Sequence, residues 1–185
     1  MVAAIANTEL ESDVRDKLMA DILKTVEPVE VWARRLFEAE LSIIFEHGYY
    51  ESDRPASTRL CLQKGARLYT TDVGAIAKDR LRGKTIWVFA CESGKGTSTV
   101  HRGNAQQSDS SLLATFIECG ATSVLSCLWK VAPINASRFL FQLLDEITVA
   151  DIAQEYTVAL RRCAAVESHA MAAIARVGAF VWYAQ

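Results

Sequence analysis

A cysteine and a histidine far apart in this 185-residue sequence have the types and the placement that nucleophilic catalysis requires. Cys91 comes directly after the apolar run 86–90, and His47 comes directly after the mainly apolar stretch 40–46. Short runs rich in β-branched and aromatic residues are typical of buried strands in a parallel sheet. In open α/β sheets, ligand chemistry lies just past the carboxyl ends of such strands. We therefore expect both side chains at the same edge of one sheet.

The pairing of these two residue types predicts a cysteine nucleophile with a histidine as its acid–base partner. A thiolate attacks carbonyl carbon readily, and an imidazole exchanges protons near neutral pH. A cysteine after a strand can also be simply a small buried side chain. We assign this second interpretation to the other four cysteines, which are Cys61, Cys119, Cys127 and Cys163. His101 and His169 lie in polar stretches and are interpreted as solvated.

Strands and helices that could position the two residues alternate along the chain, which predicts an α/β fold with a mostly parallel sheet. The periodicity predicts strands at 40–46, 84–90, 122–129 and 177–183. It predicts helices at 12–26, 29–39, 71–81, 111–119, 133–147 and 151–165, with a short turn at 170–176. Residues 1–10 are expected to be a loose start and residues 48–55 a polar loop. A β-hairpin is expected at 58–62 and 66–70, turning at Gly65 with a positive φ.

The stretch that follows Cys91 stays polar for about twenty residues, from 92 to 111. Loops of this length in compact domains are usually functional or disordered. We expect this loop to line a substrate cleft. The phosphate-loop pattern fails around Lys95, and the nucleophile-elbow pattern of serine hydrolases fails around Ser93.

Composition indicates one globular domain, with 51% hydrophobic and 23% charged residues. The formal net charge of −2 argues against a general nucleic-acid or anionic membrane surface. No apolar run approaches the ~18 residues of a spanning helix, and the first residues lack the features of a signal peptide. Five cysteines without a Cys-x-x-Cys pair indicate reduced thiols, and no histidine has zinc-like spacing to them. The sequence thus predicts a cytoplasmic protein without metal or cofactor.

Several motifs, in order, resemble one clan of cysteine peptidases. His47-Gly48 after one strand and Cys91-Glu-Ser-Gly94 after the next are similar to the caspase-like fold of caspases, separases and gingipains. Within this clan the sequence is identified as a member of the CHAT family. Further similar segments are 55–62, 112–124, Leu128-Trp-Lys-Val131 and 178–181.

The resemblance implies a caspase-like three-layer sandwich: a central sheet flanked by helices, with a β-hairpin insertion. The peptidase domain would span 40–185, and 1–39 would be an N-terminal helical segment packed on the core or leading into it. His47 and Cys91 would be catalytic, and the N–H groups of Gly48 and Cys91 would form the oxyanion hole. Three further residues near the cleft are candidates for substrate binding: Glu92, Asp109 and Trp129. Asp109 also fits a helix cap, and Trp129 also fits the core.

The sequence departs from the family pattern at three places. Ala132-Pro133 stands where the family often has an acidic pair, which affects the expected pocket specificity. The predicted helix 12–26 stands where the family has a strand before the histidine. Tetratricopeptide repeats, which often accompany the family, are absent from this sequence. The resemblance therefore implies a catalytic piece that works with a separate regulatory partner protein or a fused sensor domain.

Two functions follow as hypotheses. The first is a cysteine endopeptidase that cleaves a specific protein substrate after a partner or ligand signal. The resemblance implies a bacterial setting such as antiviral defence, CRISPR-associated immunity or cell death. The second is a catalytically silent caspase-like module that acts as a scaffold or regulator. An acyl- or thiol-transfer enzyme on the same cysteine is a third alternative.

Overall fold

The computed structural model describes residues 1–6, 10–18, 20–25, 28–50, 57–62, 65–95, 111–146, 152–165 and 178–184. Its main sheet has six strands in the order β2-β1-β3-β7-β8-β9. All neighbours pair in parallel except β9, which is antiparallel to β8. The strands of this sheet are β1 (Val2–Ala6), β2 (Asp21–Ile22), β3 (Leu41–Phe45), β7 (Thr85–Phe89), β8 (Ser123–Cys127) and β9 (Phe180–Ala184).

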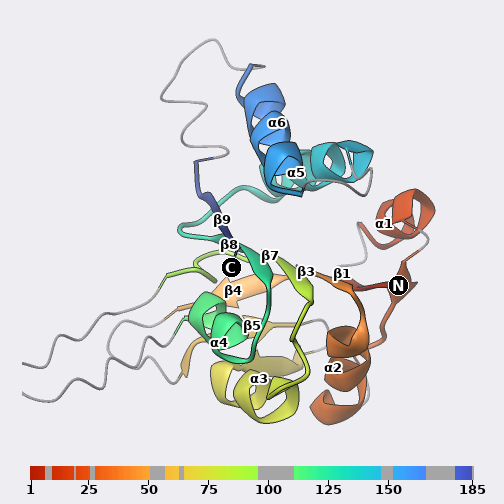
Figure 1. Ribbon diagram of the computed structural model, residues 1–185, viewed down its shortest axis with the longest axis vertical. Coiled ribbons are helices and arrows are strands. Elements are labelled where there is room, and N and C mark those ends of the chain that lie inside the picture. The colour runs from red at the N-terminus through yellow and green to blue at the C-terminus, as the bar shows by residue number, and fades with distance from the viewer. Residues whose placement is uncertain are drawn as a thin grey trace, which may run out of the picture.

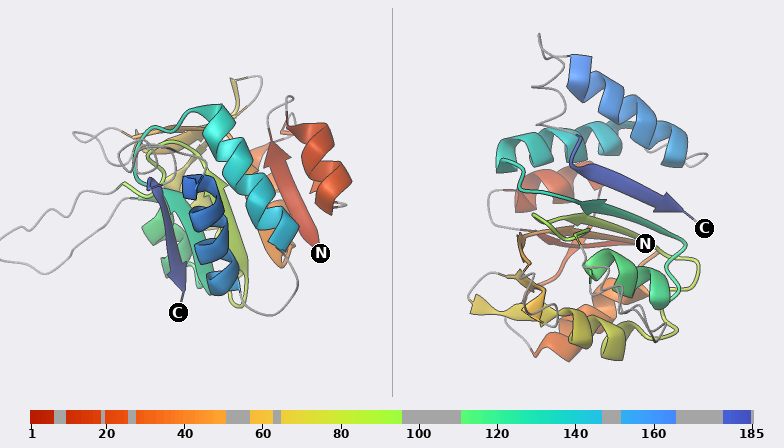
Figure 2. Two further views of the ribbon diagram at one scale, coloured as in Figure 1. Left: turned by 90° about the horizontal axis from the view of Figure 1, so that it is seen from above. Right: turned by 90° about the vertical axis from the view of Figure 1, so that its left-hand side faces the viewer.

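Helices cover both faces of the main sheet, so the molecule has three layers (Figures 1 and 2). One face carries α2 (Val29–Glu38), α3 (Thr70–Ala77) and α4 (Leu112–Glu118). The other carries α1 (Glu11–Leu18), α5 (Pro133–Glu146) and α6 (Ile152–Ala165). The right-hand view of Figure 2 shows α5 and α6 on one side of the sheet and α3 on the other. The predicted α/β class and sandwich architecture are confirmed.

The two central strands alternate their side chains between two hydrophobic cores. In β3, Ile44 belongs to the core under α2, α3 and α4, whereas Ile43 and Phe45 belong to the core under α5. In β7, Val88 belongs to the core under α2, α3 and α4, and Phe89 belongs to the core under α5. Since both faces are buried, the strands read as continuous apolar runs rather than as alternating ones. This explains why their positions can be predicted from sequence.

A second sheet lies beside the carboxyl end of β3. Its strands are β4 (His47–Tyr49), β5 (Arg59–Cys61) and β6 (Arg67–Tyr69), all antiparallel. The predicted hairpin is confirmed, and Gly65 has a φ of +79°. The expectation that 48–55 is a loop is wrong at its start, because Gly48 and Tyr49 belong to β4. Three residues without alternating hydrophobicity give too weak a periodic signal for a strand prediction.

The beginning of the chain also differs from the prediction. Instead of a loose start, Val2–Ala6 forms β1, a buried strand paired in parallel with β3. Instead of a helix over 12–26, α1 ends at Leu18 and Ile22 lies in β2. Three of the five β1 residues are alanines, which have low strand propensity, so the pattern is weak. The strand that the sequence interpretation found missing before His47 is therefore present.

The remaining predicted helices and strands are confirmed to within a few residues at their ends. The predicted turn at 170–176 and loop residues 96–110 lie outside the described residues. The division into segments 1–39 and 40–185 stays a prediction, although β1 and β3 share one sheet. Among the helices that the structure describes, none combines the length and the hydropathy of a membrane span.

Candidate active site

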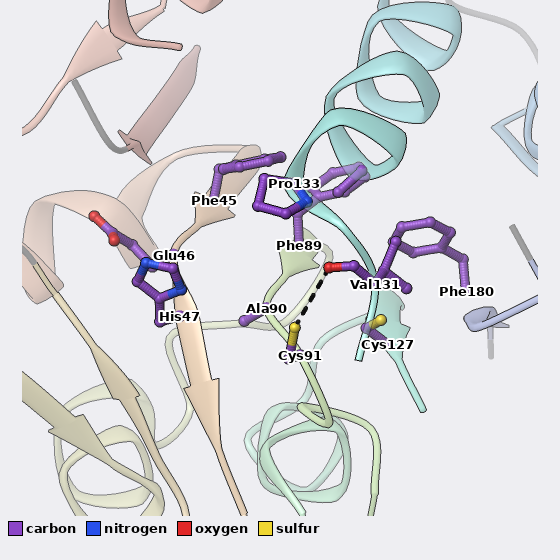
Figure 3. A pocket seen from close by; sticks show the side chains of 11 residues that line it. Phe45, Glu46, His47, Phe89, Ala90, Cys91, Cys127, Val131, Pro133 and Phe180 are labelled. Carbon is purple, nitrogen blue, oxygen red and sulfur yellow. Dashed lines mark hydrogen bonds between the residues drawn. The ribbon is translucent and has the colours of Figure 1, made fainter. Parts of the chain in front are cut away.

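Strand register brings the two candidate catalytic residues to one edge of the main sheet. Phe45 in β3 pairs with Phe89 in β7, and these are the last paired residues of the two strands. His47 and Cys91 each lie two residues beyond that pair. Because β3 and β7 are parallel neighbours, both side chains emerge at the same carboxyl edge, as the sequence predicts. Both line one pocket (Figure 3).

The pocket at this edge has an empty volume of about 400 Å³, which includes solvent at its mouth. His47 is exposed and Cys91 is half-buried. Most of the wall is apolar and comes from β3, β7, β9, α5 and the segment before α5. The apolar side chains are Phe45, Phe89, Ala90, Val131, Pro133, Ala136 and Phe180. Those of α5 and β9 are not identified by the sequence, because nothing local marks a residue that reaches the site through packing.

Gly48 packs directly against the backbone of Cys91. A Cβ atom added at Gly48 would overlap the carbonyl oxygen of Cys91 and would lie 2.9 Å from its carbonyl carbon and 3.1 Å from its nitrogen. Only glycine permits two backbones to approach this closely. The contact fixes β4, and with it His47, against the residue that carries the thiol. The proposed oxyanion residues therefore do lie together.

The thiol of Cys91 is directed to a backbone carbonyl. Its Sγ lies 3.7 Å from the carbonyl oxygen of Val131 and donates a hydrogen bond to it (Figure 3). Among the residues that the structure describes, no hydrogen bond joins His47 to Cys91. Figure 3 shows that the hydrogen bond from Cys91 to Val131 is directed away from His47.

The turn after Cys91 is held to the end of β8 by hydrogen bonds. The Ser93 hydroxyl lies 2.9 Å from that of Ser126 and accepts from the Cys127 amide at 3.2 Å. The Gly94 amide donates to the Cys127 carbonyl at 2.9 Å. Glu92 takes a φ of +58°, a conformation that costs a non-glycine residue about 1 kcal/mol or more. This buried network fixes the backbone that follows the thiol. Sequence analysis missed it, because Ser126 is far from the motif.

Two of the three predicted substrate-binding residues lie outside the pocket wall that His47 and Cys91 share. Glu92 forms an ion pair with Lys95 at 3.2 Å, and Trp129 is 38% exposed. Neither lines the pocket. Asp109 lies outside the described residues. The structure thus brings together His47, Gly48 and Cys91 but does not place Glu92 or Trp129 in the pocket wall.

Cys127 is a second thiol in the pocket wall, but its environment makes it unreactive. It is only 2% exposed, and burial raises its pKa to about 12. Its Sγ donates a hydrogen bond to the carbonyl oxygen of Trp129 at 3.0 Å. Because the thiolate is the reactive form, Cys127 stays inert near neutral pH. Of the two thiols, Cys91 is the candidate nucleophile.

Glu46 is a buried acid next to His47. The residue is 7% exposed, and burial raises the pKa of its carboxyl from 4.5 to about 7. No salt bridge joins Glu46 to another residue in the described part of the chain. Figure 3 shows its carboxyl turned away from Cys91. Its position therefore does not support a role in orienting the His47 imidazole toward Cys91.

Glu46→Gln is expected to stabilise the protein at pH 8 but not at pH 5. A carboxyl with a raised folded-state pKa keeps its proton better in the folded state, so stability falls as pH rises from about 4.5 to 7. The total loss is about 3 kcal/mol, at ~1.36 kcal/mol per pKa unit. Urea unfolding of both proteins at the two pH values measures the difference. An equal difference at pH 5 and pH 8 would contradict this assignment.

Within the described ranges, no group of three or more histidine, cysteine, aspartate or glutamate side chains could hold a metal ion. The five cysteines are free thiols. The prediction that no cofactor is needed remains untested by these observations.

Comparison with known proteins identifies a fold relative. The chain is similar to separase in the crystal structure of the Saccharomyces cerevisiae separase–securin complex, with a TM-score of 0.62. The two sequences are 14% identical over 99% of this chain and 11% of the separase chain. This likeness shows a caspase-like fold. No family model and no curated protein matches the sequence. The chain thus corresponds to a small part of the much longer separase polypeptide.

Proposed function

We propose that this chain is a cysteine endopeptidase module of the caspase-like clan, with His47 and Cys91 as its catalytic dyad. One observation carries the proposal. The register of β3 and β7 brings an imidazole and a thiol to one pocket, while Gly48 rests on the backbone of Cys91. A buried structural cysteine needs neither a neighbouring histidine nor such a backbone approach.

The reaction begins when Cys91 loses its proton to His47 and turns away from Val131. The sulfur attacks the substrate's carbonyl carbon, and the oxygen becomes an oxyanion that the backbone N–H groups of Gly48 and Cys91 stabilise. The carbon–nitrogen bond then breaks, and His47 gives its proton to the departing amine. Water hydrolyses the thioester, which releases an acid and restores the thiol.

The direction of the thiol supports a regulated enzyme. The Cys91 Sγ donates a hydrogen bond to the Val131 carbonyl, and among the described residues no hydrogen bond joins it to His47, so the dyad is not assembled. We assign the present geometry to a resting state that a protein partner, fused sensor domain or ligand converts to an active one. A CHAT-type peptidase of cytoplasmic bacterial defence, including a CRISPR-associated one, fits this scheme. Its proposed substrate is a specific protein.

The test is covalent labelling of the purified chain with a peptidyl acyloxymethyl ketone, followed by mass spectrometry of the modified peptide. The peptidyl group of the reagent is itself a ligand of the pocket, so labelling is expected at Cys91 without a partner protein. His47→Ala should lower the labelling rate by about 100-fold or more, in the range of acid–base catalysis. Iodoacetamide provides the control, because it reports thiol accessibility without substrate-like binding. Equal rates of peptidyl labelling in the wild type and in His47→Ala would show that His47 takes no part in the reaction.

A catalytically silent module is the second candidate. The unassembled dyad favours it, because a scaffold needs no hydrogen bond between His47 and Cys91. In that case iodoacetamide would modify Cys91 while the peptidyl reagents would not. Labelling that depends on His47 would exclude the silent module.

A further inference from the structure

We propose that the pocket beside Cys91 binds the side chain of the residue whose carbonyl is attacked, and that this residue is apolar. The inference rests on the proposed peptidase function and adds its substrate preference. Neither the family resemblance nor the fold relative assigns this preference. It follows from the side chains that form the wall.

The position of the pocket follows from the attack geometry. The reacting carbonyl carbon must come within about 3–3.5 Å of the sulfur. The side chain of that same residue branches from the Cα atom next to the carbonyl carbon, so it must enter a space that borders Cys91. The described pocket lies there, because Cys91 itself is part of its lining.

The inner wall of the pocket is aromatic and closely packed. Phe89 lies 5.6 Å from Phe180 and 5.8 Å from Phe45, measured between ring centroids. Phe139 stacks on Phe180 at 4.6 Å and supports the cluster from α5. Such a wall gains free energy by covering an apolar side chain and supplies no partner for a charge.

The part of the pocket wall that comes from α5 carries no polar side-chain atom. Ala136, from the first turn of α5, contributes only a methyl group to the lining. Pro133, also from this turn, contributes a ring without a polar side-chain atom. A substrate side chain that enters here meets carbon atoms, which suits leucine, methionine or phenylalanine.

The charged groups near the pocket do not favour a charged substrate residue. Glu46 is the one carboxylate in the described wall, and Figure 3 places it on the far side of His47 from Val131 and Phe180. No lysine or arginine belongs to that described wall. At the apolar end of the pocket, away from His47, an aspartate side chain would therefore be buried without a cation, and a lysine or arginine would lack a carboxylate.

The experiment measures the rate of Cys91 labelling by four peptidyl acyloxymethyl ketones that differ only in the residue next to the reactive group. These residues are leucine, alanine, arginine and aspartate. The leucine reagent is expected to react about tenfold or more faster than the two charged reagents, the scale of discrimination in apolar pockets. A faster reaction of the arginine or aspartate reagent overturns the inference while the peptidase function stands.

A substitution in the wall tests the same inference independently. Ala136→Leu fills the pocket, so the leucine reagent should lose about tenfold in rate while the alanine reagent keeps its rate. Ala165→Leu, an exposed alanine-to-leucine change at the end of α6, is the matched control and should alter neither rate. An unchanged leucine rate in Ala136→Leu would overturn the pocket assignment. Failure of all four reagents to label wild-type Cys91, while iodoacetamide still modifies it, would overturn both proposals.

Discussion

Replacing Cys91 by alanine is expected to abolish peptide-bond cleavage, with a loss on the order of 10⁴-fold or more. The substitution removes the atom that forms the covalent intermediate, and no other thiol can replace it. Cys127, in the same wall, is buried with its pKa raised to about 12. Cys91→Ser should be nearly as inactive, because a hydroxyl is a weak nucleophile without strong activation. Cleavage of a confirmed protein substrate, followed by gel electrophoresis, measures the effect.

The fold should survive the Cys91→Ala change. The side chain is half-buried, and in the part of the chain that the structure describes its one hydrogen bond goes to Val131. A weak thiol hydrogen bond contributes at most about 1 kcal/mol, so the melting temperature should shift by only a few degrees. Cys163→Ala, which also removes a half-buried thiol but from α6, is the control and should cleave normally. Undiminished cleavage by folded Cys91→Ala would show that the nucleophile lies elsewhere.

The meeting of His47 and Cys91 at one sheet edge can be predicted from sequence because it follows from a general rule. Each residue comes after a short run that is wholly or mainly apolar, which is typical of a strand buried on both faces. Parallel neighbours place their carboxyl ends together, so no knowledge of side-chain packing is needed. The register Phe45 to Phe89 fulfils this rule. Gly48 was placed by the family resemblance, and its backbone contact with Cys91 gives that placement a steric reason.

Features that depend on contacts between distant segments could not be predicted in this way. The alanines of β1 carry little strand propensity, and the strand forms because pairing with β3 satisfies its backbone and buries it. Ala136 and Phe180 enter the pocket through the packing of α5 and β9 on the sheet. The Cys91 thiol points to the carbonyl of Val131, which lies 40 residues further along the chain. Local sequence patterns contain none of this information.

Gly48→Ala is the second change with a large expected effect, and its cause is steric. A Cβ atom at this position overlaps the Cys91 carbonyl oxygen, so β4 and the turn after β7 must move apart. Backbone cannot yield as a flexible side chain can, and such overpacking costs about 1–3 kcal/mol of stability. The displacement also moves His47 and one proposed oxyanion donor relative to the sulfur. A shift of about 1 Å in such a geometry can cost ~100-fold in rate.

Gly74→Ala separates this effect from a general consequence of losing a glycine. Gly74 lies within α3, and a Cβ atom there meets no atom within 4 Å, so alanine should stabilise the helix by about 1 kcal/mol. Thermal unfolding and the rate of peptidyl labelling at Cys91 measure stability and geometry separately for both variants. We expect Gly48→Ala, at a temperature where it remains folded, to react at least about 100-fold more slowly than Gly74→Ala. If the two variants label at the same rate, the approach of Gly48 to Cys91 does not position the reacting groups, and the oxyanion role assigned to Gly48 is wrong.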